Sequence, residues 1–257
     1  MSHHSLVDAL SNQGLCIHEM YKSLREQIEK QGRVIVSING IPGGGKTYIA
    51  GQLKNLAYRD EFGVGIIHTD DYLQVPRKAR LAAGLSGYNN QSYDLELLTD
   101  HLTAISALPV GSSCDVEYPR YNSSKGRSST NPLTFTGDGM VIVEGLKSFN
   151  PCLLESIGAC IWIDGGRDAR KQLRNYRDWN KGYKRADALI NEKIHGRDWR
   201  CFNDENQKFI EKLNNAGKSR LVSELSACIN RDEHTDVQNL ERKDERRYFP
   251  CSAMCSE

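Results

Sequence analysis

Long hydrophobic runs are absent from this sequence of 257 residues. None approaches the roughly 20 consecutive apolar residues that a transmembrane helix needs. The first five residues contain neither a charged leader nor an apolar segment typical of a signal peptide. We therefore expect a cytoplasmic protein with no membrane partner.

An excess of charge of either sign is also missing. Lys and Arg number 34 and Asp and Glu number 33, so the formal net charge is +1. Proteins that bind nucleic-acid backbones usually carry a basic excess, and we expect no nucleic-acid partner here. The eight cysteines include no C-x-x-C pair, which excludes a readable zinc ribbon or thioredoxin motif.

The hydrophobic pattern predicts an α/β fold. Apolar residues at three- and four-residue spacing over 17–31 indicate an amphipathic helix. A β-rich run at 34–38, a helix at 46–58 and a second β-rich run at 64–67 follow it. This alternation implies parallel strands joined by crossover helices.

The second half of the pattern adds another helix and two buried strands. A leucine-rich helix is expected over 94–108 and a strand near 115–118. Residues 119–138 are rich in Ser, Asn, Gly and Pro, which is typical of a long loop or hairpin excursion. Compact apolar runs at 140–143 and 159–163 have the pattern of strands buried on both faces, and we expect them in the central sheet.

Residues 40–47, Gly-Ile-Pro-Gly-Gly-Gly-Lys-Thr, fit the phosphate-loop pattern G-x-x-x-x-G-K-[ST] between a strand and a helix. The backbone N–H groups of such a loop point at phosphate oxygens. A dinucleotide-binding loop would not require the Lys-Thr pair. Lys46 would contact the β- and γ-phosphates of ATP, and the Thr47 hydroxyl would bind magnesium. The expected nucleotide-binding residues of this segment are Gly40, Pro42, Gly43, Gly44, Gly45, Lys46, Thr47 and Tyr48.

Three carboxylates follow expected strands. Asp70 and Asp71 come after the run at 64–67, at the edge of the sheet beside the phosphate loop, where one could accept a proton from a hydroxyl. Either could instead be a helix N-cap. Glu144 ends the run at 140–143 and is expected to hold magnesium with Thr47 and Asp70, unless it only faces solvent.

A basic segment begins at Arg167. Arg170, Arg174 and Arg177 follow at four- and three-residue steps, so they share one face of a helix. This face could close over a triphosphate as a lid, at about 167–200, and offset charge on the transferring phosphoryl group. A solvated basic face is the ordinary alternative.

With these motifs in this order, the chain resembles the phosphoribulokinase and uridine kinase family of P-loop kinases over roughly residues 33–223. The resemblance rests on the phosphate loop and the segments Thr69 to Tyr72, Ser92 to Leu98, Tyr118 to Tyr121, Val143 to Gly145 and Arg174 to Asp178. It implies a three-layer sandwich of the P-loop NTPase type with a parallel central sheet, a small hairpin or loop excursion and a helical lid. It also implies that Asp70 is the catalytic base and that Asp71, Asp94 and Tyr121 lie at the acceptor. Lys46 and Arg174 complete the expected catalytic set, and Arg177 joins the nucleotide contacts.

The chain departs from the uridine kinase pattern after Tyr121. Asn122 stands where that pattern has Asp, and the expected histidine is absent from the residues that follow. Lys125 and Arg127 occupy this stretch and would suit a carboxylate or phosphate on the acceptor. P-loop glycerate kinases resemble the chain in the same segment, and pantothenate kinases share its general layout. We therefore expect uridine and cytidine to be poor acceptors.

The expected function is an ATP- and magnesium-dependent kinase that acts on a hydroxyl of a small-molecule metabolite. The alternatives are a nucleoside kinase proper and a non-catalytic, nucleotide-dependent regulatory module. The expected domains are an N-terminal helix (1–32), a P-loop kinase domain (33–224) and a polar C-terminal tail (225–257). The sequence leaves open a homo-oligomer and the choice between ATP and GTP.

Overall fold

A central parallel sheet organises the chain. The computed structural model describes residues 13–40, 45–122 and 127–163, together with 202, 204–209, 211–212 and 215. The four parallel strands stand in the order β2-β5-β1-β6. Their bounds are Arg33–Gly40 for β1, Val64–His68 for β2, Gly139–Glu144 for β5 and Ala159–Ile163 for β6. Every residue of β5 is buried, which confirms the expected central strand.

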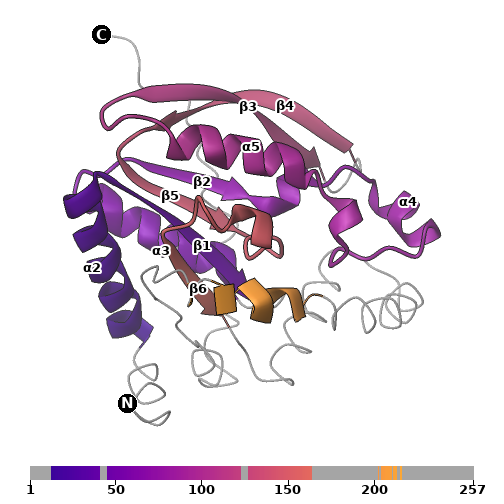
Figure 1. Ribbon diagram of the computed structural model, residues 1–257, viewed down its shortest axis with the longest axis horizontal. Helices are drawn as coiled ribbons and strands as arrows, with labels where there is room; N and C mark the ends of the chain where they lie inside the picture. The colour runs from indigo at the N-terminus through magenta and orange to yellow at the C-terminus, as the bar shows by residue number, and fades with distance from the viewer. Residues whose placement is uncertain are drawn as a thin grey trace, which may run out of the picture.

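Helices α2 (Gln13–Gln31) and α3 (Lys46–Arg59) cover one face of the sheet (Figure 1). Side chains alternate between the two faces along a strand, and Val36 of β1 therefore lies in this layer. Leu24 of α2 and Leu53 of α3 belong to the same buried cluster. The amphipathic helix expected over 17–31 is confirmed, and its apolar side packs in the same buried cluster as β1 and α3.

The opposite face carries α5 (Leu95–Ser106) and a hairpin of β3 (Ser113–Asn122) and β4 (Arg127–Thr136) (Figure 1). A second buried cluster joins this layer to the sheet and includes Ile35, Leu98, Leu102, Ile105, Val116, Tyr118, Phe135, Val141 and Val143. Two apolar layers on either side of a parallel sheet make the three-layer sandwich expected from the sequence.

The excursion over 119–138 is a hairpin for most of its length. β3 pairs antiparallel with β4 from Ser113 opposite Thr136 to Asn122 opposite Arg127. β3 is longer than the strand expected at 115–118, and the pair forms a sheet of its own. Because alternate residues of β3 face inward, the hairpin holds Tyr118 against the core.

The connection between β2 and α5 crosses the carboxyl end of the sheet. It contains η1 (Thr69–Tyr72), α4 (Arg77–Ala82) and η2 (Asn90–Ser92). An isolated antiparallel bridge joins Leu73 to Tyr93, so the start and the end of the connection lie together. α4 lies at the far side of the molecule from α2 (Figure 1).

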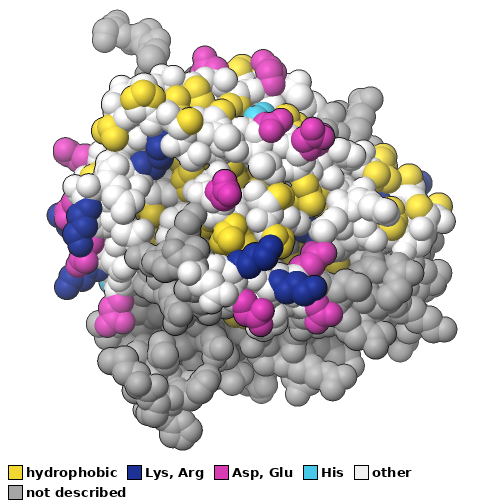
Figure 2. All heavy atoms as spheres, viewed as in Figure 1, with side chains coloured by type: hydrophobic (Ala, Val, Ile, Leu, Met, Phe, Trp, Pro, Cys, Tyr) yellow, Lys and Arg dark blue, Asp and Glu magenta, His cyan; other side chains and the backbone are white. Residues whose placement is uncertain are grey.

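Several expectations fall on residues that the structure does not describe. They are the lid at about 167–200 and the tail at 225–257. Among the described helices, none has the length and apolar character needed to cross a bilayer. On the face drawn in Figure 2, the described Lys and Arg side chains are interspersed with Asp and Glu side chains.

Candidate functional site

Two glycines with positive φ flank the phosphate loop. Gly40 has φ 149°, and a Cβ at this position would lie 2.2 Å from the carbonyl oxygen of Ile163. Gly45 has φ 87° and is the N-cap of α3. Lys46 Nζ donates to the Gly40 carbonyl at 3.0 Å, so this side chain crosses from one end of the loop to the other. Glycine conformations of this kind at Gly40 and Gly45 are what close approach of a phosphate to the backbone requires.

Two of the three residues expected to hold magnesium, Thr47 and Glu144, are in contact at the carboxyl end of β5. Thr47 Oγ1 donates to Glu144 Oε1 at 3.1 Å. Glu144 ends β5, next to β1 in the sheet, and is buried. The same Oε1 lies 2.6 Å from Nδ1 of His68, which is paired with Glu144 in the β2–β5 register. The solvent-facing alternative for Glu144 is therefore wrong.

The Glu144–His68 contact sets the charge of both groups. Burial acts to raise the pKa of Glu144, but the hydrogen bond and charge of His68, with Lys46 and Thr47, outweigh it and hold that pKa below its ordinary value. Burial acts to lower the pKa of His68, whereas the bond to Glu144 and the nearby carboxylates raise it above its ordinary value. Glu144 is consequently a carboxylate at neutral pH.

A carboxylate and a hydroxyl are oxygen ligands of the kind magnesium prefers. Within the described residues, no group of three or more His, Cys, Asp and Glu side chains could hold a metal ion. Magnesium in kinases usually takes one or two protein oxygens and completes its shell with phosphates and water. The Thr47–Glu144 pair therefore fits a magnesium ion that arrives with a nucleotide.

Asp70 and Asp71 differ sharply in their surroundings although they are adjacent on η1. Asp71 accepts hydrogen bonds from the Tyr118 hydroxyl and from the backbone N–H of Tyr121, both at 3.1 Å. Asp70 is exposed, and its Oδ1 lies 3.5 Å from the Tyr93 hydroxyl. The N-cap of η1 is His68, so the N-cap role weighed for either aspartate is wrong. Asp71 joins η1 to β3 of the hairpin, whereas the Asp70 side chain is exposed.

The remaining expected acceptor residues are placed unevenly. Asp94 is the N-cap of α5, where its Oδ1 accepts from the Leu97 backbone N–H at 3.0 Å. The half-buried side chain of Tyr121 lies near the guanidinium of Arg80. Arg127 pairs with Asn122 at the end of the hairpin, and only its backbone is described.

Other expected site residues lie outside the described part of the chain or give no contact to interpret. Tyr48 is 58% exposed on the first turn of α3. The expected residues outside the described ranges are Pro42, Gly43, Gly44, Lys125, Arg174 and Arg177. Their roles stay predictions.

Sequence reasoning missed three side chains at this end of the sheet: His68, Arg80 and Lys147. His68 meets Glu144 only because β2 lies next to β5, and the order of strands is not written in the sequence. Lys147 is 1% exposed and donates to the Tyr88 carbonyl at 2.5 Å. The sequence feature that could have pointed to Lys147 is its position three residues after Glu144.

Lys147 lies where three segments of the chain meet. Its Nζ lies 3.6 Å from Glu205 Oε2 and is 5.8 Å and 5.7 Å from the ring centroids of Tyr93 and Phe202. A buried ammonium group needs such partners, because removing it from water is costly. Lys147 thus joins the segment after β5 to the residues at 202–205.

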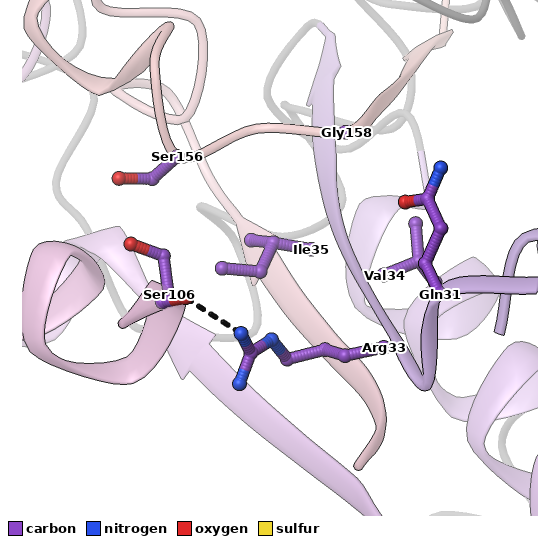
Figure 3. Close-up of a pocket in the computed structure, with 7 residues that line it drawn as sticks. All are labelled: Gln31, Arg33, Val34, Ile35, Ser106, Ser156 and Gly158. Carbon is purple, nitrogen blue, oxygen red and sulfur yellow. Dashed lines mark hydrogen bonds between the residues drawn. The ribbon is translucent and has the colours of Figure 1, made fainter. Parts of the chain in front are cut away.

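A cavity of about 210 Å³ lies at the opposite edge of the sheet (Figure 3). Arg33, at the amino end of β1, donates there to the carbonyls of Ser106, Leu108 and Gly137. These bonds fix the end of α5 and leave the guanidinium engaged with the protein. The residues that line the cavity are Gln31, Arg33, Val34, Ile35, Ser106, Ser156 and Gly158.

Comparison with known proteins identifies the fold. No protein-family model and no curated protein sequence matches the chain. D-glycerate 3-kinase from Cryptococcus neoformans superposes with a TM-score of 0.53 at 13% identity, over 76% of this chain and 89% of that one. A protein from Bacillus stearothermophilus described as a possible uridine kinase gives 0.50 at 20% identity, over 63% and 90%.

A third structure extends the same likeness. YFH7 from Saccharomyces cerevisiae, provisionally described as a P-loop-containing kinase with a circular permutation, gives a TM-score of 0.59 at 12% identity, over 74% and 95% of the two chains. At such identities the likeness establishes the fold. It agrees with the parallel sheet, the flanking helices and the strand–loop–helix at 33–59. The chain has the α/β fold of the P-loop kinases.

Proposed function

We propose that this protein is an ATP- and magnesium-dependent kinase that transfers the γ-phosphoryl group to a hydroxyl of a small-molecule metabolite. The observation that carries the proposal is the contact between Thr47 and Glu144 at 3.1 Å, directly beside Lys46 and the phosphate loop. Asp70 follows the neighbouring strand β2 and supplies an exposed carboxylate at the same edge of the sheet.

Each of these residues has a defined part in the proposed reaction. The loop N–H groups and Lys46 bind the phosphates, and Thr47 and Glu144 hold magnesium, which neutralises charge on the phosphate oxygens. Asp70 accepts the proton of the attacking hydroxyl and orients it for in-line transfer. Asp71 is bonded to Tyr118 and Tyr121, so it serves as a support for the acceptor residues.

The structural neighbours include a glycerate 3-kinase and a possible uridine kinase, so we consider both a glycerate-like and a nucleoside acceptor. The stretch after Tyr121 carries Asn122, Lys125 and Arg127. These residues supply hydrogen-bond donors for a carboxylate or phosphate. They lack the acidic group and the histidine of the uridine kinase pattern. We therefore expect glycerate-like anions to be better acceptors than uridine or cytidine.

A coupled ADP-release assay of the purified chain tests the proposal. The screen offers uridine, cytidine, glycerate, pantothenate, sugars and amino acids, each with ATP or GTP and with or without magnesium. A magnesium-dependent rise in ADP release with one class of acceptor is expected, with phosphorylated acceptor as its product. Slow hydrolysis that no metabolite changes would instead indicate a nucleotide-dependent regulatory module.

A further inference from the structure

Two buried polar atoms on α4 and β3 have no hydrogen-bond partner within the described part of the chain. They are Nη1 of Arg80, on α4, and the hydroxyl oxygen of Tyr121, on β3. The guanidinium carbon of Arg80 lies 6.0 Å from the centroid of the Tyr121 ring, at the distance of a cation–π contact. The two unpartnered groups therefore belong to neighbouring side chains from segments about 40 residues apart in the sequence.

Both side chains are linked to the aspartate pair. The backbone N–H of Tyr121 donates to Asp71 at 3.1 Å. Arg80 acts on Tyr93: burial and Asp70 raise the pKa of Tyr93 well above its ordinary value, and the charge of Arg80 opposes that shift. The Tyr93 hydroxyl donates to the Gly87 carbonyl at 2.7 Å and lies 3.5 Å from Asp70. The Arg80–Tyr121 pair is thus linked to Asp71 through the Tyr121 backbone and to Asp70 through Tyr93.

The absence of a hydrogen-bond partner for Arg80 Nη1 needs a physical explanation. Burying a hydrogen-bonding group without a partner is unfavourable, most of all for a charged group, and folded proteins pair nearly all such atoms. The described residues contain three further unpartnered buried atoms, on Gln27, Asn90 and Asn206, and all of them belong to neutral amides. Arg80 also makes no ion pair with a described residue. Its charge is therefore available to an anion.

We propose that Arg80 and Tyr121 bind an oxyanion, a carboxylate or a phosphate ester, on the acceptor whose hydroxyl is presented to Asp70. The inference rests on the proposed kinase function and adds to it the class of acceptor and the residues that select it. The guanidinium fork donates to two oxygens of such a group, and the tyrosine hydroxyl donates to one. A neutral polyol would leave the guanidinium nitrogen without a charged partner. The two side chains therefore select for an anion.

The test compares acceptors that differ only in the anionic group: D-glycerate against glycerol, and D-ribose 5-phosphate against D-ribose. The first pair examines a carboxylate and the second a phosphate ester. We expect the anionic member of at least one pair to be the better substrate of the wild type. Arg80→Gln should lower kcat/KM for it about 100-fold, as loss of one partner of a buried charged pair does, mainly through KM. The KM for ATP and the activity on the neutral member should stay near wild type.

Two further variants and one control sharpen the test. Arg80→Lys keeps the charge without the planar fork and should recover only part of the loss. Tyr121→Phe keeps the ring against which Arg80 lies and should cost about 10-fold, the effect of one hydrogen bond to a charged group. Lys78→Gln removes an exposed cation from the same helix and should change nothing.

The outcomes separate this inference from the kinase proposal. Equal use of anionic and neutral acceptors, or an Arg80→Gln variant with unchanged selectivity, overturns the inference and leaves the kinase intact. If no acceptor is phosphorylated, the kinase proposal fails with these compounds, and titration calorimetry with D-glycerate and with inorganic phosphate decides the anion site. Binding by the wild type that Arg80→Gln loses supports the site, whereas equal binding or none overturns it.

Discussion

The proposed phosphate side of the site is built on neighbouring strands of the central sheet and the start of α3, whereas the proposed acceptor side is built from side chains of separate segments. The proposed phosphate side includes Gly40, His68 and Glu144, at the ends of three adjacent parallel strands, and Lys46 and Thr47, at the start of α3. The acceptor side comprises Asp70, Asp71, Arg80, Tyr93 and Tyr121, which come from η1, α4, the approach to α5, and β3.

The difference explains how each side could vary. A strand–loop–helix that curls around phosphates depends on glycine conformations at Gly40 and Gly45, and few other residues can adopt them. The proposed acceptor side depends on side chains from a hairpin and a short helix. If the proposal holds, replacing Arg80 or Tyr121 alters the acceptor without disturbing the central sheet. The same fold can therefore serve different acceptors.

Removing the loop lysine breaks the phosphate side and has the largest expected effect. We predict that Lys46→Ala lowers phosphoryl transfer about 1000-fold or more, because a cation is lost from a preorganised electrostatic site. The fold should survive, since Lys46 lies outside both apolar clusters. Single-turnover transfer and circular dichroism measure the two properties. Near-normal turnover would remove the phosphate-loop assignment.

Asp70 and Asp71 are expected to have different roles, Asp70 as the proton acceptor and Asp71 in positioning the hairpin. We predict that Asp70→Asn abolishes most transfer, by about 100-fold or more, while nucleotide binding survives, because the hydroxyl loses its proton acceptor. Asp71→Asn should have the milder effect on kcat and should lower the free energy of unfolding, because Asp71 bonds Tyr118 and Tyr121 of the hairpin. Fluorescent-nucleotide titration and urea unfolding accompany the rate measurements. The reverse order of kcat effects would move the base to Asp71.

Replacing the buried Lys147 tests how the residues near the proposed acceptor side are joined to the residues at 204–209. We predict that Lys147→Met lowers the free energy of unfolding by about 2 kcal/mol, because it leaves the Tyr88 carbonyl without its donor and Glu205 without a partner charge. Lys212→Met, at an exposed position of the same C-terminal part, is the matched control. Urea unfolding curves provide the measurement. An unchanged midpoint for Lys147→Met would mean that the described 202–209 segment is not held by this contact.

The sequence predicts the proposed phosphate side better than the proposed acceptor side. The strand, loop and helix at 33–59, Thr47 and Glu144 follow from local pattern, and the structure brings the expected pair into contact. The β2-β5-β1-β6 order is not visible in the sequence, so the bond between His68 and Glu144 was missed. Arg80 lies on a helix of six residues with no clear periodicity, and its approach to Tyr121 arises only from the tertiary fold.

The smallest expected effect concerns the layer behind the acceptor side. His101 of α5 is buried, and its Nδ1 lies 2.8 Å from the Tyr72 hydroxyl. The Tyr72 ring packs edge-on against Tyr118, which in turn bonds Asp71. Burial lowers the pKa of His101 below its ordinary value, although Asp100 and Asp94 oppose the shift. The folded protein therefore holds this imidazole in its neutral form, with Tyr72 as its partner.

The sign of the pH effect follows from that lowered pKa. The unfolded chain binds a proton at His101 near pH 6.5, before the folded protein does. The stability that neutral His101 contributes is therefore complete above about pH 6.5 and is lost as the pH falls through the folded pKa. His101→Gln keeps a hydrogen-bonding side chain but cannot take up the proton, so its unfolding free energy should decline less between pH 7.5 and pH 5 than that of the wild type. Urea unfolding at several pH values measures this difference. His18→Gln, at an exposed position of α2, is the control. Parallel pH curves for wild type and His101→Gln would show that the contact with Tyr72 does not depend on the neutral imidazole.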